Sequence, residues 1–253
     1  MTNRRNQQAP AAPPVDQQMV DQAVDEVRRR LKQAGRPDIA AQFKKSLGDD
    51  VPCYGVKPAQ VQQIGLEVVR RHRTGGLAVA MAIGDPLFMS GNLEEGQIGA
   101  QVVGTMGRHV TGADFDKFDV WAGALTNAQV ADALGTSCLS PALAAKPSLA
   151  MKLVDWAKAP SRWRRRAAVS GFVPLVREGR FMTDALTVAE VVMEDDDEEV
   201  QRGVGNLLLE ASRLKADRVV EFLQEWKNKS PKLIVQIAAT KLSQADRSSV
   251  LGQ

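Results

Sequence analysis

Apolar residues recur at intervals of three and four along most of the chain. Residues 20–33, 57–72 and 93–110 each show this spacing, which places apolar side chains on one face of an α-helix. Sustained alternation of apolar and polar residues, which indicates a half-buried strand, is rare. The pattern therefore predicts an all-α protein.

A helix–turn–helix pattern repeats about every 36 residues in the second half of the chain. The units span 148–176, 184–212 and 216–243, and residues 113–139 have the same spacing. In this register Arg166, Arg202 and Ala238 occupy equivalent positions, 36 residues apart. Ala167 and Gly203 are small enough for the second helices to pack closely. Stacked helix pairs are typical of an α-solenoid of HEAT-like repeats; an irregular helical domain is the alternative.

The first 18 residues differ in composition from the rest of the chain. They are rich in Gln, Pro and Ala and lack the apolar core of a secretion signal. We expect a disordered tail over residues 1–18 and a single HEAT-like repeat domain over residues 19–253. No apolar run approaches the roughly 20 residues that a membrane-spanning helix needs, so we expect no membrane partner.

The few cysteines and histidines narrow the chemistry. Cys53 and Cys138 lie 85 residues apart, and neither has a second ligand at metal-binding spacing. We therefore expect no metal site, no cofactor and no disulfide framework, and a cytoplasmic protein. With only two histidines in the chain, an enzyme of this sequence would rely on carboxylates as catalytic groups.

Positive charge is concentrated in one stretch, although the net charge is only +3. Residues 158–180 hold seven Lys or Arg and one Glu. If Ser161 caps a helix, Arg162, Arg165 and Arg166 share an arc of about 100° on it. Two interpretations are open: a phosphate site beside the free N–H groups of the helix start, or ion pairs with the acidic run 194–199 of the next repeat. Both can hold together, with one arginine paired and the others free.

Asp132 is the candidate catalytic residue. It is the one acid in the apolar segment 127–139, where a carboxylate needs a partner or a function. The repeat register offers Arg166 as its partner, and an Asp paired in this way stays ionised, so pairing and catalysis are compatible. Arg162 and Arg165 would then face phosphates, and Arg164 has no assigned role.

Five segments follow one another in a characteristic order: FKKSLGDDVPCYGVKPAQVQQI, LFMSGNLEEGQIGAQVVG, NAQVADAL, RWRRRAAVS and EVQRGVGNLLLEAS. In this order they resemble the DNA alkylation repair family of HEAT-like repeat DNA glycosylases, over about residues 20–245. The best single match is Trp163, Arg166, Ala167 and Ala168, spaced W-x-x-R-A-A.

The resemblance implies a concave basic groove that holds duplex DNA and excises N3- or N7-alkylated purines without flipping the base into a pocket. It assigns Asp132 to stabilising the oxocarbenium-like sugar and positioning water, and Arg166 to holding the backbone. The two tryptophans of the family site correspond here to Ala128 and Asn206, and the acid that follows the first corresponds to Gln129.

We therefore expect a monomer that binds double-stranded DNA, is nucleoid-associated when bound, and has N-glycosylase activity. The side chains expected to bind DNA are Arg162, Trp163, Arg165, Arg166 and Arg202. Trp163 fits packing between repeats as well as base stacking. A non-catalytic repeat module that binds DNA structures or a protein is the alternative function, and a scaffold indifferent to DNA is the third.

Overall fold

The structure, a computed structural model, describes residues 15–48 and 50–252. Within these residues it consists of helices and connecting turns, without a strand. The α-helices are α1 Gln17–Ala34, α2 Pro37–Leu47, α3 Pro58–His72, α4 Gly76–Met89, α5 Leu93–Gly104, α6 Phe115–Ala122, α7 Ala128–Leu134, α8 Ser140–Ala145, α9 Ala150–Ala157, α10 Arg162–Ser170, α11 Val173–Arg177, α12 Met182–Val191, α13 Glu198–Trp226, α14 Lys232–Ala238 and α15 Gln244–Leu251.

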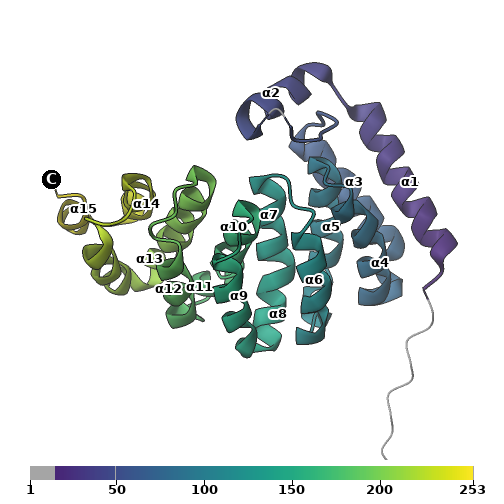
Figure 1. Ribbon diagram of the computed structural model, residues 1–253. Helices are drawn as coiled ribbons and strands as arrows, with labels where there is room; N and C mark the ends of the chain where they lie inside the picture. Colours follow the sequence, from purple (N-terminus) through teal and green to yellow (C-terminus); the bar gives the residue numbers. More distant parts are fainter. Residues whose placement is uncertain (1–14, 49, 253) are drawn as a thin grey trace, which may run out of the picture.

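The helices stack as pairs that follow one another in chain order (Figure 1). In each pair a first helix precedes a second one, as α4 precedes α5 and α9 precedes α10. The second helices α3, α5, α7, α10 and α13 contact one another in that order. The prediction of an all-α protein of HEAT-like repeats is therefore confirmed.

Helix boundaries depart from the sequence expectations at two places. Helix α1 begins at Gln17, and the side chain of Asp16 caps it by accepting from the N–H of Met19 at 3.3 Å. The predicted tail 1–18 therefore runs two residues too far, and its residues 1–14 lie outside the described part of the chain. Helix α13 joins the two helices expected at 199–212 and 216–227, with a kink at Lys215 (φ −137°, ψ 56°) in place of a loop.

Second helices approach one another closely where glycine faces a neighbour. A Cβ at Gly135 would lie 2.7 Å from the Cβ of Ser170, and one at Gly203 would lie 3.2 Å from the Cγ of Arg166. Neither distance leaves room for a side chain without a shift of the neighbour. These contacts bring the residues of α7, α10 and α13 within hydrogen-bonding reach.

The tryptophans of the first helices belong to the core. Trp121 is fully buried, stacks on Phe88 with 4.4 Å between ring centroids, and donates its indole N–H to Asp85 at 2.7 Å. Trp156 is buried and packs against Phe115. Such rings stabilise the stack through the large apolar area that they remove from water.

A buried carboxylate fixes the turn before α3. Glu94, in the first turn of α5, is fully buried and accepts the backbone N–H groups of Tyr54, Gly55 and Val56 at 3.0, 2.8 and 3.0 Å. Gly55 has φ 78°, a left-handed conformation that favours glycine. The carboxylate thus satisfies three donors that burial would otherwise leave unpaired.

Candidate functional site

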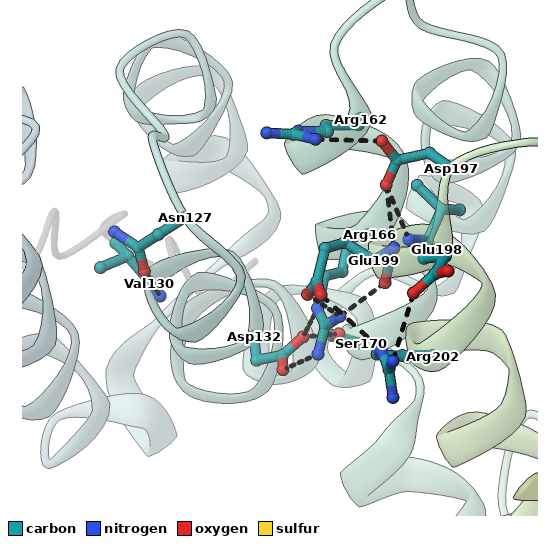
Figure 2. Close-up of polar contacts among 11 residues, drawn as sticks. Asn127, Val130, Asp132, Arg162, Arg166, Ser170, Asp197, Glu198, Glu199 and Arg202 are labelled. Carbon is teal, nitrogen blue, oxygen red and sulfur yellow. Dashed lines mark hydrogen bonds and ion pairs between the residues drawn. The ribbon is translucent and has the colours of Figure 1, made fainter. Parts of the chain in front are cut away.

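Asp132 and Arg166 face each other across the boundary between α7 and α10 (Figure 2). The guanidinium donates Nε to Oδ1 at 2.9 Å and Nη2 to Oδ2 at 2.7 Å. The hydroxyl of Ser170 donates to Oδ1 at 2.6 Å. The Asp132 side chain is 39% exposed and that of Arg166 only 11%. The carboxylate is therefore held in place by these hydrogen bonds and remains partly exposed to solvent.

The local sequence explains how these side chains meet. The side chain of Asn127 caps α7 by accepting from the N–H of Val130 at 3.0 Å, and Ser161 caps α10 as the sequence predicts. A π-helical turn, Gly135–Leu139, follows α7 directly. Such turns occur often at functional sites because they shift the helix register by one residue. Here Gly135 leaves the room in which Ser170 reaches Asp132.

Arg166 also contacts the following repeat. Its Nη1 donates to the carbonyl of Glu199 at 2.5 Å and to the Glu199 carboxylate at 3.0 Å. Burial by itself lowers the pKa of the guanidinium, but the hydrogen bond to Asp132 and the charges of both acids outweigh it and raise the pKa above its usual value. Arg166 therefore stays charged and joins α7, α10 and α13.

The other arginines of the cluster are paired with the acidic run. Arg165 is 19% exposed and binds Asp195 through Nε at 2.6 Å and Nη2 at 3.0 Å. Arg162, half exposed, reaches Asp197 at 3.2 Å and lies 4.4 Å from the ring of Trp163, which is buried. Of the two interpretations left open by the sequence, ion pairing is therefore the one observed. Arg165 would have to leave Asp195 to contact a phosphate, so its role in DNA binding stays a prediction.

Arg164 has a role that sequence reasoning missed. It donates to the carboxylate of Asp119 at 2.8 Å and to the Asp119 carbonyl at 2.9 Å, and it lies over the ring of Trp156. This arginine connects α10 to α6 on the previous repeat. An acid 45 residues earlier gives no signal in the helical period, so the partner could not be found from the sequence.

A row of polar side chains crosses four second helices. Gln97 on α5 donates to Gln129 on α7 at 2.7 Å. Asp132, Arg166 and Glu199 continue it, and the row ends at Arg202, whose Nε lies 3.7 Å from a Glu199 oxygen and whose side chain is half exposed (Figure 2). We call these six residues the polar row.

The positions of the two expected aromatic walls lack aromatic rings. Ala128 is 6% exposed, and Asn206 is exposed one turn beyond Arg202. Trp121 does not replace them, because its ring is enclosed by Phe88 and Phe118. Trp163 is also buried. Neither of the expected aromatic walls is therefore present at the site of Asp132.

The described residues contain neither a cluster of metal-binding side chains nor a membrane-spanning helix. No group of three or more His, Cys, Asp or Glu there could hold a metal ion. None of the described helices is both long and apolar enough to cross a membrane.

Known proteins share both the sequence pattern and the fold of the chain. A family model described as DNA alkylation repair enzyme matches residues 27–242. Among solved structures, the chain is similar to a predicted DNA alkylation repair enzyme from Enterococcus faecalis, with a TM-score of 0.71 and 12% identity, over 83% of this chain and 97% of that chain. That similarity shows a shared fold, and no curated protein matches. Because the family model spans most of its length, the chain belongs to the DNA alkylation repair enzyme family.

Proposed function

We propose that the chain binds duplex DNA across the polar row and cleaves the N-glycosidic bond of N3- or N7-alkylated purines, with Asp132 as the catalytic carboxylate. Family membership supports a role in alkylation repair. The partly exposed, arginine-held carboxylate supports the chemistry.

The single observation that carries the proposal is the unequal use of the two carboxylate oxygens. Oδ1 of Asp132 accepts from both Arg166 and Ser170, whereas Oδ2 accepts only from Arg166 among the described residues. A carboxylate oxygen has capacity for about two acceptor contacts. Oδ2 therefore keeps a lone pair for a sugar or a water molecule.

The reaction that fits this group needs an anion and no general acid. Alkylation at N3 or N7 makes the purine cationic, so the C1′–N bond breaks with its electron pair moving to the base, which leaves neutral. The positive charge that develops on the deoxyribose faces the Asp132 carboxylate. Water then adds to C1′, and its proton passes to the carboxylate or to solvent. Preorganised charge of this kind is worth about 100-fold or more in rate.

A second function is favoured by the missing aromatic walls. With Ala128 and Asn206 at those positions, Asp132 is more accessible to solvent than it would be between two aromatic rings. Solvent raises the local dielectric constant, and this weakens the electrostatic stabilisation of the developing positive charge. A non-catalytic member that binds alkylated or distorted DNA without cutting a bond fits this observation.

Release of free base from a duplex containing 7-methylguanine or 3-methyladenine separates the two functions. We expect release by the wild type and a loss of about 100-fold or more for Asp132→Asn. Asp116→Asn is the matched control, because Asp116 is 86% exposed on α6 and has one weak ion pair at 3.4 Å.

Each other outcome has a defined meaning. Binding without release by excess wild-type protein contradicts the glycosylase and supports the non-catalytic function. Equal release by wild type and Asp132→Asn contradicts the assignment of Asp132. Absence of binding to any duplex contradicts both functions.

A further inference from the structure

The turns that end successive second helices lie against one another. His72, the last residue of α3, and Arg73 line the same small cavity as Thr105 and Met106, which follow α5. In the next repeat, Gly112 faces the side chain of Lys146, which follows α8. These turns therefore form one continuous edge of the stack.

The edge continues into the second half of the chain. Helix α8 contacts α11, and a Cβ at Gly179, in the turn after α11, would lie 3.7 Å from the side chain of Leu214. Lys215 follows at the kink of α13. Figure 1 shows α7 and α8 running in succession from one edge of the stack to the other. The starts of the second helices therefore lie on one edge, and their ends lie on the opposite edge.

The exposed cations of this edge include one that follows α3, one that follows α5, one that follows α8 and one at the kink of α13. These four are Arg73, Arg108, Lys146 and Lys215, which we call the basic rim. None of the four takes part in an ion pair among the described residues. Arg177 and Arg180, on the intervening turn, are paired with Glu210 and Glu178.

The opposite edge carries an acidic run where α13 begins, along with exposed cations such as Lys158. The run 194–199 consists of six acids in six residues, and its last two are the first residues of α13. Arg162 and Arg165 neutralise part of it, and they would have to leave these pairs to reach a phosphate. Bringing a phosphate strand to the acidic run costs electrostatic energy, whereas the basic rim attracts one without breaking a pair.

We propose that the basic rim binds the phosphate backbone of the duplex, so that one strand follows the ends of the second helices, away from the acidic run. This inference rests on the proposed function, because it takes duplex DNA as the partner. It transfers the main phosphate contacts from the arginines of α10 to Arg73, Arg108, Lys146 and Lys215. Cations at helix C-termini also stabilise the helix through its dipole. Thermal melting measures this stabilising role separately from DNA binding.

The test compares two sets of four substitutions in the full chain. The rim variant carries Arg73→Ala, Arg108→Ala, Lys146→Ala and Lys215→Ala. The matched control carries Lys57→Ala, Lys158→Ala, Lys229→Ala and Lys232→Ala, which remove four exposed cations at or next to the starts of α3, α10 and α14. Affinity for a fluorescent unmodified duplex is measured by anisotropy over a range of salt concentrations.

The rim variant is expected to flatten the plot of log affinity against log salt by about 0.9 for each phosphate that the protein no longer neutralises. The control is expected to change the slope by less than half as much. Arg73→Lys with Arg108→Lys keeps both charges and should bind like the wild type, which shows that binding depends on the charge of these positions. Thermal melting of each variant checks folding.

Three results would overturn the inference. One is wild-type binding that the rim variant leaves unchanged, with or without a loss of thermal stability. Another is an equal effect of the rim and control sets. The third is a loss of binding in the charge-preserving variant. If the wild type itself shows no salt-dependent binding, the proposed function fails as well, and that failure is distinct because no variant is needed to see it.

Discussion

Arg166 and Asp132 come from neighbouring repeats and bind each other through two parallel hydrogen bonds of 2.9 and 2.7 Å. The same guanidinium also donates to the Glu199 carboxylate on α13, in the repeat that follows. A two-point pair of this kind fixes the orientation of the carboxylate as well as its charge. The contact that stabilises the stack therefore also presents Asp132 to solvent.

Removing this arginine should destabilise the fold. Arg166→Ala leaves Asp132 and Glu199 without their shared cation, and because Asp132 is partly exposed we expect a loss of about 2 kcal/mol in the free energy of unfolding. Urea denaturation measures it. Arg202→Ala, which removes an exposed arginine with ion pairs of 3.3 and 3.7 Å, is the control and should cost under about 0.5 kcal/mol. Equal losses would contradict the shared-cation role.

Ser170 should act as a positioning residue. Ser170→Ala removes the 2.6 Å hydrogen bond to Oδ1 of Asp132, and a bond worth about 1 kcal/mol corresponds to roughly a fivefold lower rate of base release. DNA affinity should not change, because Ser170 is buried. Single-turnover release and anisotropy measure the two quantities. Ser212→Ala, a buried serine bonded to a carbonyl of its own helix, is the control; the idea fails if affinity falls with the rate.

An aromatic ring at Asn206, the position of a family tryptophan, should strengthen DNA binding. Asn206 is exposed, so Asn206→Trp adds a ring without displacing core atoms. Stacking of about 1–3 kcal/mol per ring predicts tighter binding of the duplex by roughly fivefold or more. Gln236→Trp, on an exposed position of α14, tests whether any added tryptophan has this effect. An equal gain in affinity in both variants would contradict the assignment of Asn206 to the DNA-binding site.

The lowered pKa of Glu210 should make the stability of the fold depend on pH. The hydrogen bond from Arg177 lowers the pKa of Glu210 below its usual value; burial opposes this, and the charges of Arg177 and Arg213 reinforce it. Because the folded pKa is depressed, the stabilisation is present at neutral pH and is lost as the pH falls through the folded pKa. Glu210→Gln should therefore lower the denaturation midpoint at pH 7 and have a diminishing effect in acid.

Glu190→Gln is the control for this titration, because Glu190 is exposed and takes part in no ion pair among the described residues. Its effect should be small at every pH. A difference between wild type and Glu210→Gln that persists unchanged at low pH would contradict the depressed pKa.

The sequence by itself determined the class of fold and one contact of the site. Helical period and a 36-residue repeat are local properties of the chain, so they predict helices and their stacking order directly. The same register places Arg166 one repeat after Asp132, and the two residues do pair. The small residue Gly203 indicates the close approach of α13 to Arg166 on α10.

Only the tertiary structure decided which charges are free. Several acids lie within reach of the α10 arginines, and the choice among them depends on the rotation of one repeat against the next, which no period of the sequence records. Arg165 thus joins Asp195, and Arg164 reaches back to Asp119. The burial of Trp121 against Phe88 was decided in the same way. Pairing between repeats is a property of their relative placement, so it follows from packing and not from local sequence.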